Sequence, residues 1–233
     1  METERLNYVL GNETIYLDVC KYGNSDLVFL NLHENEQTSV LAAKEILKNE
    51  SGILLELKSR KERLISFTKG EELYIFDPNR MFSVAGIKCS LEEYSTYEPQ
   101  IANEILLFAK WILKEISEHE PRWLVALHNT SGDYSIEGYL KGASYEKDAA
   151  DLFVNAKRHK GDFFFTSDRE AFIKIRNSGF NVVFQNNDLV IDDGSLSVYC
   201  GQNGIPYINI EALHGHLEQQ MEMVEFICNG FLS

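Results

Sequence analysis

The sequence lacks the cysteine spacing of a disulfide framework or of a thiolate metal site. Its four cysteines, Cys20, Cys89, Cys200 and Cys228, lie far apart, and no two of them are spaced as CxxC. Scattered cysteines of this kind are typical of buried thiols in a reducing compartment. We therefore expect a cytoplasmic protein rather than a secreted one held together by disulfides.

Basic residues and long apolar runs are also scarce. The chain has 22 lysines and arginines against 36 aspartates and glutamates, and a net charge of −14. This charge argues against a phosphate backbone or an anionic membrane as the main partner. No run approaches the roughly 18 apolar residues of a membrane helix, and the charged residues 1–5 lead into no apolar signal core. We expect neither a nucleic acid nor a membrane as partner.

Repeats, low-complexity tracts and linkers rich in proline, glycine or serine are absent from the sequence. A chain of 233 residues that is 44% hydrophobic can bury one sizeable core. We predict a single domain over residues 1–233.

Apolar runs and amphipathic segments alternate along the chain. Residues 26–32 form an almost continuous apolar run, typical of a strand covered on both faces, whereas residues 14–19 alternate and indicate an edge strand. This order predicts a three-layer α/β/α domain with a mixed, mostly parallel central sheet. The other expected strands cover residues 52–57, 72–76, 123–127, 162–166, 182–184, 197–199 and 206–210, and the expected helices cover residues 38–47, 101–116, 145–157, 167–179 and 216–227.

Two potential metal ligands follow the apolar run at residues 26–32. His33 and Glu36 are three positions apart, so an imidazole and a carboxylate can point at one ion from the first turn after the strand. The alternative for His33 is a surface or hydrogen-bonded histidine. His33-Glu34 also resembles the start of the metalloprotease motif HExxH, but position 37 is Gln37. That motif is therefore absent, and Glu34 is not our candidate base.

A third potential ligand, His128, ends another buried apolar run at residues 122–127. In open α/β sheets, ligands bind outside the carboxyl ends of the strands, so His128 can lie beside His33 although the two are far apart in sequence. Neutral imidazole and carboxylate oxygen suit zinc, and three protein ligands with an open fourth position are typical of a catalytic site. We predict that His33, Glu36 and His128 bind one Zn²⁺ ion.

Further polar groups lie at the ends of other strands. Asn79 and Arg80 present an amide and a guanidinium, which can bind a carboxylate. The alternative is a turn built on Pro78 with an exposed arginine. Glu211 ends the strand at residues 206–210, where it either caps the next helix or faces a cleft.

The order of these residues is more specific than any one motif. It resembles the zinc carboxypeptidase superfamily, in particular its branch of succinylglutamate desuccinylase and aspartoacylase-like enzymes. The resemblance implies that Glu211 is the general base, and that Arg63, seventeen positions before Arg80, stabilises the transition state. The matching stretches are His33-Glu34-Asn35-Glu36, Asn79-Arg80, Leu127-His128-Asn129-Thr130 and Glu211.

Two residues depart from the pattern of the superfamily. The usual glycine after the first histidine is Glu34 here, and the aspartate often found two positions before the third ligand is Ala126. Aspartoacylase-like enzymes also carry an additional carboxyl-terminal β domain, whereas this chain ends about twenty residues after Glu211. We therefore expect the catalytic core only, and do not carry over acyl-amino-acid specificity.

The resemblance predicts hydrolysis of an amide bond next to a free carboxylate, which Asn79 and Arg80 would bind. The expected substrate is a small peptide or an N-acylated amino acid. An N-acyl-amino-acid amidohydrolase is one alternative, and a catalytically silent metal- or ligand-binding domain is another.

Several residues keep two interpretations. They are His214 and His216, which belong to a loop or helix start or to a second shell or second metal; Tyr199 and Tyr207, which pack or donate a hydrogen bond to substrate; Glu218, a runner-up base expected on the exposed face of the last helix; and His119 and His159, expected to be solvated.

Overall fold

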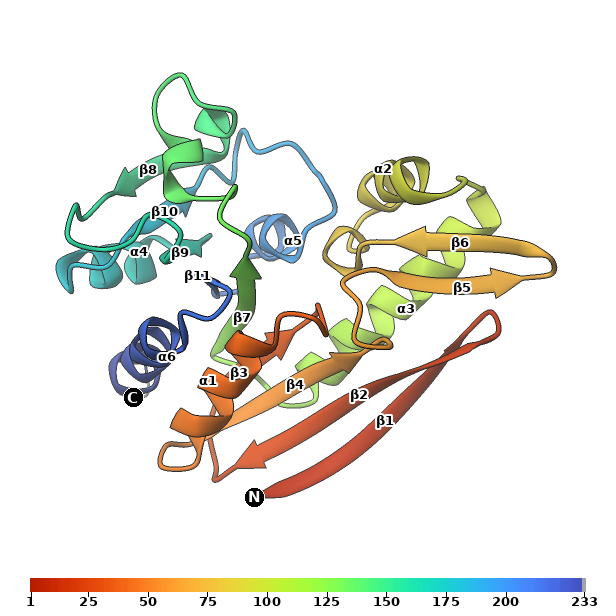
Figure 1. Cartoon of the computed structure of the whole chain (residues 1–233), viewed down its shortest axis with the longest axis horizontal. Helices are drawn as coiled ribbons and strands as arrows, with labels where there is room; N and C mark the ends of the chain where they lie inside the picture. The colour runs from red at the N-terminus through yellow and green to blue at the C-terminus, as the bar shows by residue number, and fades with distance from the viewer. Residues whose placement is uncertain (232–233) are drawn as a thin grey trace.

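The computed structural model describes residues 1–231, in which strands and helices alternate along the chain (Figure 1). The strands are β1 (Glu2–Leu10), β2 (Glu13–Tyr22), β3 (Leu27–Asn31), β4 (Gly52–Lys58), β5 (Ile65–Lys69), β6 (Glu72–Phe76), β7 (Trp123–Thr130), β8 (Ala149–Phe153), β9 (Phe163–Thr166), β10 (Val182–Gln185) and β11 (Tyr207–Leu213). The helices are α1 (Gln37–Leu47), α2 (Val84–Tyr94), α3 (Pro99–Ser117), α4 (Arg169–Asn177), α5 (Leu196–Asn203) and α6 (Leu217–Phe231), with short 3-10 turns η1 (Pro78–Arg80), η2 (Ile136–Tyr139) and η3 (Glu146–Asp148).

A nine-stranded mixed sheet forms the middle layer, in the order β1-β2-β4-β3-β7-β11-β9-β10-β8. The four central strands, β4, β3, β7 and β11, are parallel to one another, and β9 is parallel to β10. The pairings β1–β2, β2–β4, β11–β9 and β10–β8 are antiparallel. The sheet is therefore mixed, as predicted, but its parallel part is confined mainly to the centre rather than dominating the whole sheet.

Helices cover both faces of the sheet (Figure 1). The strand β7 shows this alternation directly, because Leu124 and Ala126 belong to the hydrophobic cluster that includes residues of α2, α3 and α5, whereas Val125 and Leu127 belong to the cluster that includes residues of α1, α4 and α6. A sheet buried on both faces needs apolar side chains at successive positions, which is why its central strands read as continuous apolar runs. The predicted three-layer α/β/α architecture is confirmed.

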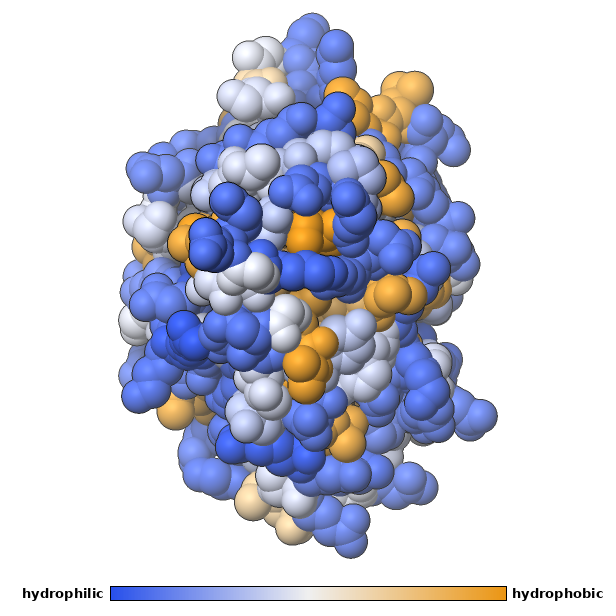
Figure 2. All heavy atoms as spheres, turned by 90° about the vertical axis from the view of Figure 1, so that its right-hand side faces the viewer, coloured by the Kyte–Doolittle hydropathy of each residue, from blue (hydrophilic) through white to orange (hydrophobic). Residues whose placement is uncertain are grey.

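A separate two-stranded hairpin, β5–β6, leaves the sheet and packs beside α3. The ring of Phe76 contacts that of Phe108 on α3 edge to face, with a centroid distance of 6.5 Å. Ile65 pairs with Phe76 at the open end of the hairpin, so the residues just before β5 and just after β6 emerge together. Figure 2 shows the side of the molecule on which this hairpin lies as mostly hydrophilic, with hydrophobic side chains in small, scattered patches.

Two of the predicted elements are wrong. Residues 145–157 form η3 and the edge strand β8 rather than a helix, because antiparallel pairing with β10 overrides the local helix preference of glutamate, lysine and alanine. Residues 197–199 belong to the helix α5 rather than to a strand. The Ser195 side chain accepts a hydrogen bond from the Val198 N–H, and Gly204 ends this helix in the left-handed conformation.

Other elements differ in position or were not predicted. The strand expected at residues 14–19 is β2, which is covered by β1 and is not at the edge. The strands β7 and β11 continue past residues 127 and 210, so His128 and Glu211 lie within strands rather than after them. The helix expected at residues 167–179 is α4, which is capped by the Asp168 side chain and begins at Arg169. The pattern of the sequence did not indicate β1, β5 or α2.

The structure shows whether the cysteines are buried and whether any described helix is long and apolar enough to cross a membrane. Cys20, Cys200 and Cys228 are buried free thiols, as expected, whereas Cys89 is exposed on α2. Within residues 1–231, no helix is both long and apolar enough to cross a membrane.

Close packing between α2 and the segment before α5 gives a test of the fold. A Cβ atom at Gly86 would overlap the Cα atom of Gly194 and lie 2.5 Å from the carbonyl oxygen of Asp193. Replacing a helical glycine by alanine normally stabilises a protein by up to about 1 kcal/mol. At this position we expect Gly86→Ala to lower the free energy of unfolding in urea by about 1–3 kcal/mol instead, because the methyl group has no space.

The matched control is Gly230→Ala in α6, where a Cβ atom would make only ordinary contacts, the closest at 3.6 Å. We expect this variant to lose no stability. If the two variants were equally stable, α2 would not pack against Gly194 as described.

Candidate metal centre

A tight turn after β3 brings His33 and Glu36 together. The Glu36 N–H donates to the His33 carbonyl oxygen at 3.0 Å, and α1 begins directly afterwards. Both side chains turn into the protein, with exposed fractions of 0% for His33 and 1% for Glu36. The Glu36 carboxylate is then 3.0 Å from the His33 Nδ1 atom.

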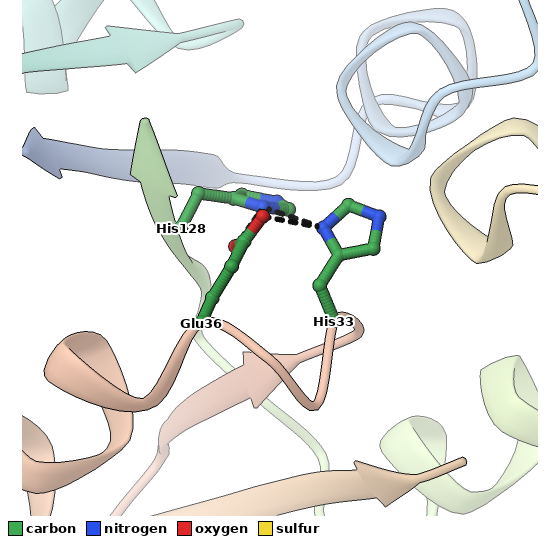
Figure 3. A group of neighbouring side chains, drawn as sticks. All are labelled: His33, Glu36 and His128. Carbon is green, nitrogen blue, oxygen red and sulfur yellow. Dashed lines mark hydrogen bonds and ion pairs between the residues drawn. The ribbon is translucent and has the colours of Figure 1, made fainter. Parts of the chain in front are cut away.

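His128 joins this pair from β7, the strand that pairs in parallel with β3 (Figure 3). Its Nδ1 atom is 3.3 Å from the Nδ1 atom of His33 and 3.0 Å from the second carboxylate oxygen of Glu36. Ligand atoms of a tetrahedral zinc ion, each about 2.1 Å from the metal, lie about 3.4 Å apart. The three predicted ligands therefore form a cluster of the size that one divalent ion requires.

Asp77 determines which nitrogen of His33 is free to bind a metal. It follows β6, and its carboxylate is 2.8 Å from the His33 Nε2 atom. An ionised carboxylate only accepts hydrogen bonds, so His33 donates through Nε2–H, and in its neutral form it keeps a lone pair on Nδ1. This lone pair points at the Glu36 carboxylate and the His128 ring. The lone pairs of these three groups repel one another unless a cation lies between them. Carboxylate–histidine pairs of this kind commonly orient metal ligands.

Charge in the cluster also favours a cation. Burial alone would lower the pKa of His33, but the Glu36 and Asp77 carboxylates outweigh burial and raise this pKa to about 9. Burial would raise the pKa of Glu36, yet the two imidazoles hold it well below its ordinary value. A proton held at His33 occupies the place of a metal ion, and the two compete for the same lone pair.

Asn129 supports the cluster through its backbone and its side chain. Its N–H donates to the Glu36 carboxylate at 3.0 Å, and its side-chain oxygen accepts from the N–H of Ser39 in the first turn of α1 at 2.9 Å. Its amide nitrogen donates to Gln220 of α6 at 2.6 Å. Asn129 thus ties β7 to two helices.

Arg63 lies next to the cluster, at the open end of the β5–β6 hairpin. Its guanidinium donates to the Glu36 carboxylate at 2.5 Å and to the Asp77 carboxylate at 3.4 Å. The Arg63 side chain remains 48% exposed, so it links these two carboxylates and still reaches solvent.

Glu34 points away from the metal cluster. Its carboxylate accepts hydrogen bonds from the backbone N–H groups of Ser59 at 2.6 Å and Lys61 at 2.7 Å. These residues belong to the loop that leads to Arg63, and Lys61 has a left-handed backbone with φ of 62°. The residue that departs from the superfamily pattern therefore anchors the loop that carries Arg63. Ala126, the other departure, packs in the core.

A cleft of about 500 Å³ opens beside the cluster, and Glu211 lies in its wall. On the neighbouring parallel strands β11 and β7, Glu211 is in register with His128, so the two side chains leave the same face of the sheet. Burial raises the pKa of the Glu211 carboxyl, an effect that the His128 ring partly offsets. The Asn209 side chain donates to it at 3.0 Å. The cleft is also lined by Glu36, Arg63, Asn79, Arg80, His128, Tyr207 and His214.

Asn79 and Arg80 reach this cleft from η1. The Asn79 side-chain oxygen accepts from the Leu196 N–H at 3.1 Å, which joins η1 to the start of α5. The Arg80 guanidinium is 3.5 Å from the Asp193 carboxylate, and its side chain is 41% exposed. All seven residues predicted for the site therefore lie in or beside one cleft.

The residues with two interpretations separate in the structure. Tyr207 and His214 both border the cleft, and Tyr207 is buried. Tyr199 packs against Phe82 instead. Glu218 is exposed on α6, as expected. His216 and His159 lie together at a different cavity, so they do not belong to the cleft.

Two residues of the site were missed by sequence reasoning. Asp77 had a signal, since it is a carboxylate directly after a strand, but Pro78 made a turn the simpler interpretation. Asn129 lies in one of the stretches that match the superfamily, but its role had no signal, because its contact with Glu36 is made by a backbone N–H.

Comparison with known proteins supports the fold. The sequence matches no protein-family model and no curated protein. The structure is similar to that of bovine thrombin-activatable fibrinolysis inhibitor in complex with tick carboxypeptidase inhibitor, at 14% identity over 97% of this chain and 88% of that one, with a TM-score of 0.50. It is also similar to a succinylglutamatedesuccinylase/aspartoacylase from Rhodobacter sphaeroides, at 10% identity and a TM-score of 0.50, covering 99% of this chain and 65% of that one.

A third similar structure is the murein-tripeptide amidase MpaA from Escherichia coli O157, at 12% identity over 90% of this chain and 86% of that one, with a TM-score of 0.49. At sequence identities this low, the similarity supports the fold alone. The carboxypeptidase-like fold implied by the sequence resemblance is confirmed.

The contact between Asp77 and His33 can be tested through metal affinity. Asp77→Asn removes the negative charge that fixes the Nε2–H form of His33, and loss of such a partner typically lowers metal affinity by about 10- to 100-fold. We expect this loss in a competition titration with a chromogenic zinc chelator. Asp151→Asn, at an exposed position on β8, is the matched control. An Asp77→Asn protein with unchanged affinity would mean that Asp77 does not orient the ligand.

Proposed function

We propose that this protein is a zinc-dependent hydrolase that cleaves an amide bond next to a free carboxylate. The observation that carries the proposal is the convergence of three metal donors, a buried carboxylate and two arginines on one cleft. We further propose that residues 1–233 act as one catalytic domain.

His33, Glu36 and His128 would hold the zinc ion through two imidazole nitrogens and a carboxylate. When bound, zinc supplies Lewis-acid chemistry that activates a water molecule and polarises the carbonyl group of the scissile bond. The cleft leaves room for a substrate next to these ligands.

Glu211 would act as the general base. Its carboxylate would accept a proton from the attacking water and pass it to the nitrogen of the leaving amine. A carboxyl group whose pKa is raised by burial is a stronger base than one in water, which suits this task. Asn209 holds one of its oxygens and thereby fixes its direction.

Arg63 and Arg80 would bind the two negative charges of the reaction. Arg63, at the metal cluster, would stabilise the charge that develops on the carbonyl oxygen, where a preorganised donor typically contributes a few kcal/mol. Asn79 and Arg80 would bind the free carboxylate of the substrate. The Arg80 guanidinium faces the cleft, and its 3.5 Å contact with Asp193 is long enough to be exchanged for a closer carboxylate.

An N-acyl-amino-acid amidohydrolase is the second candidate. The same Arg80 would then bind the carboxylate of the amino acid rather than that of a peptide. A protein of similar fold is named a succinylglutamatedesuccinylase/aspartoacylase. A catalytically silent metal-binding domain is disfavoured, because Glu34 is engaged by backbone N–H groups and so does not place its charge on the metal cluster.

The role of Glu211 has a direct test with a matched control. Glu211→Gln keeps the shape of the side chain but removes the base, so we expect zinc content to be unchanged and kcat to fall about 10²- to 10⁴-fold. Glu218→Gln, at an exposed position of α6, should leave kcat unchanged. The assignment fails if Glu218→Gln abolishes turnover while Glu211→Gln does not.

The substrate class can be determined with three types of compound. Peptides with a free carboxyl end, the same peptides amidated at that end, and N-acylated amino acids should be compared before and after zinc chelation. We expect hydrolysis only of compounds with a free carboxylate, lost on chelation and restored by zinc. Arg80→Ala should lower kcat/KM roughly 10- to 100-fold, mainly through KM, because it removes a charged hydrogen-bond donor. Equal cleavage of amidated peptides would contradict recognition of the carboxylate.

A further inference from the structure

We propose that His159, Asp162 and His216 form a second metal site, outside the catalytic cleft. The three side chains offer ligand atoms that all lie within 4.8 Å of one another. They come from two segments that are distant in sequence, the loop before β9 and the turn between β11 and α6. This proposal is independent of the catalytic activity proposed above.

The pair Asp162–His216 is the preformed part of this second site. The His216 Nδ1 atom is 2.9 Å from one carboxylate oxygen of Asp162 and 3.1 Å from the other. Asp162 is only 6% exposed, and one of its oxygens accepts a hydrogen bond from the Leu213 N–H at 3.1 Å. A buried carboxylate held in this way has a fixed direction, as a metal ligand requires.

His159 completes the site from an exposed position. Its ring lies edge to face with that of His216, at a centroid distance of 5.2 Å. Its Nδ1 atom accepts a hydrogen bond from the Gly161 N–H at 3.1 Å, so this nitrogen carries no proton. A metal ion that binds its lone pair would replace that hydrogen bond. Ligand atoms of a tetrahedral zinc ion lie about 3.4 Å apart, whereas these atoms lie within 4.8 Å of one another. A shift of His159 by up to about 1.4 Å therefore closes the site, which an exposed loop side chain can make.

The surroundings admit a hydrated cation. The cluster borders a cavity of about 430 Å³, which leaves space for water as a further ligand. The two cations next to His159 in sequence are both paired, Arg158 with Glu222 at 2.7 and 2.9 Å and Lys160 with Glu137 at 2.6 Å. Two imidazoles and one carboxylate are the donor set that zinc and neighbouring divalent transition metals prefer.

The position of the second site suggests a structural purpose. Leu213, which donates to Asp162, follows Glu211 by two residues on β11. Between Leu213 and His216, the exposed side chain of His214 borders the catalytic cleft. An ion at His159, Asp162 and His216 would join the loop before β9 to the end of β11, and so brace the strand that carries the proposed base.

The test is a count of zinc ions bound by the full-length protein. Metal-free protein is dialysed against buffered zinc, and the bound metal is measured by elemental analysis. We expect two equivalents in the wild type, one in His159→Ala and in His216→Asn, and one in the catalytic-ligand variant His128→Asn. The control His119→Ala, which changes a histidine outside both clusters, should keep two.

The outcomes separate this proposal from the catalytic one. A wild-type protein that binds one equivalent, lost in His128→Asn and kept in His216→Asn, overturns the second site and leaves the catalytic site standing. One equivalent lost in His216→Asn and kept in His128→Asn supports the second site and contradicts the first. Loss of an equivalent in His119→Ala would show nonspecific binding to surface histidines and overturn the proposal. Because His159 is exposed, His159→Ala tests the site without removing a buried group.

Discussion

A carboxylate taken out of water must be compensated by hydrogen bonds and opposite charge, or it becomes protonated. Glu36 is 1% exposed, and the centre of the structure is arranged around this requirement. The rings of His33 and His128, the backbone N–H of Asn129 and the guanidinium of Arg63 all face its two oxygens. These groups come from three separate parts of the chain, so meeting the needs of one carboxylate fixes how those parts pack together.

The groups around Glu36 are themselves held by a second set of contacts. Asp77 holds His33 in one tautomer and shares Arg63 with Glu36. The loop leading to Arg63 is fixed in turn by the Glu34 carboxylate through two backbone N–H groups. The parallel pairing of β7 and β11 then puts Glu211 beside His128 without any direct bond between the two side chains. The proposed metal ligands, the proposed base and Arg63 are thus positioned by backbone register and by buried carboxylates rather than by flexible surface groups.

Much of this arrangement could be predicted from the sequence because it follows from local rules. His33 and Glu36 are close in sequence, and a turn after a strand brings them together whatever the rest of the fold. His128 and Glu211 could be placed because they occur at the carboxyl ends of buried apolar runs, which meet at one edge of a parallel sheet. The clustering of these residues in one cleft agrees with that reasoning.

What the sequence did not reveal depends on tertiary contacts. The strand β8 forms at residues 149–153 only because β10 is available to pair with it, against the helix preference of its own residues. Glu34 looked like an added charge at the metal, and its partners, two backbone N–H groups some 25 residues away, carry no sequence signal. His159 was expected only to be solvated, because the sequence did not show that the fold brings His216 to Asp162 beside it.

The central claim is that His33, Glu36 and His128 bind one zinc ion together. Diffraction data collected on both sides of the zinc absorption edge, from crystals grown with zinc, test it most directly. We predict an anomalous peak about 2.0–2.2 Å from the Nδ1 atoms of both histidines and from a carboxylate oxygen of Glu36. The claim is contradicted if no peak lies between these three side chains, or if the zinc found there is bound by other residues.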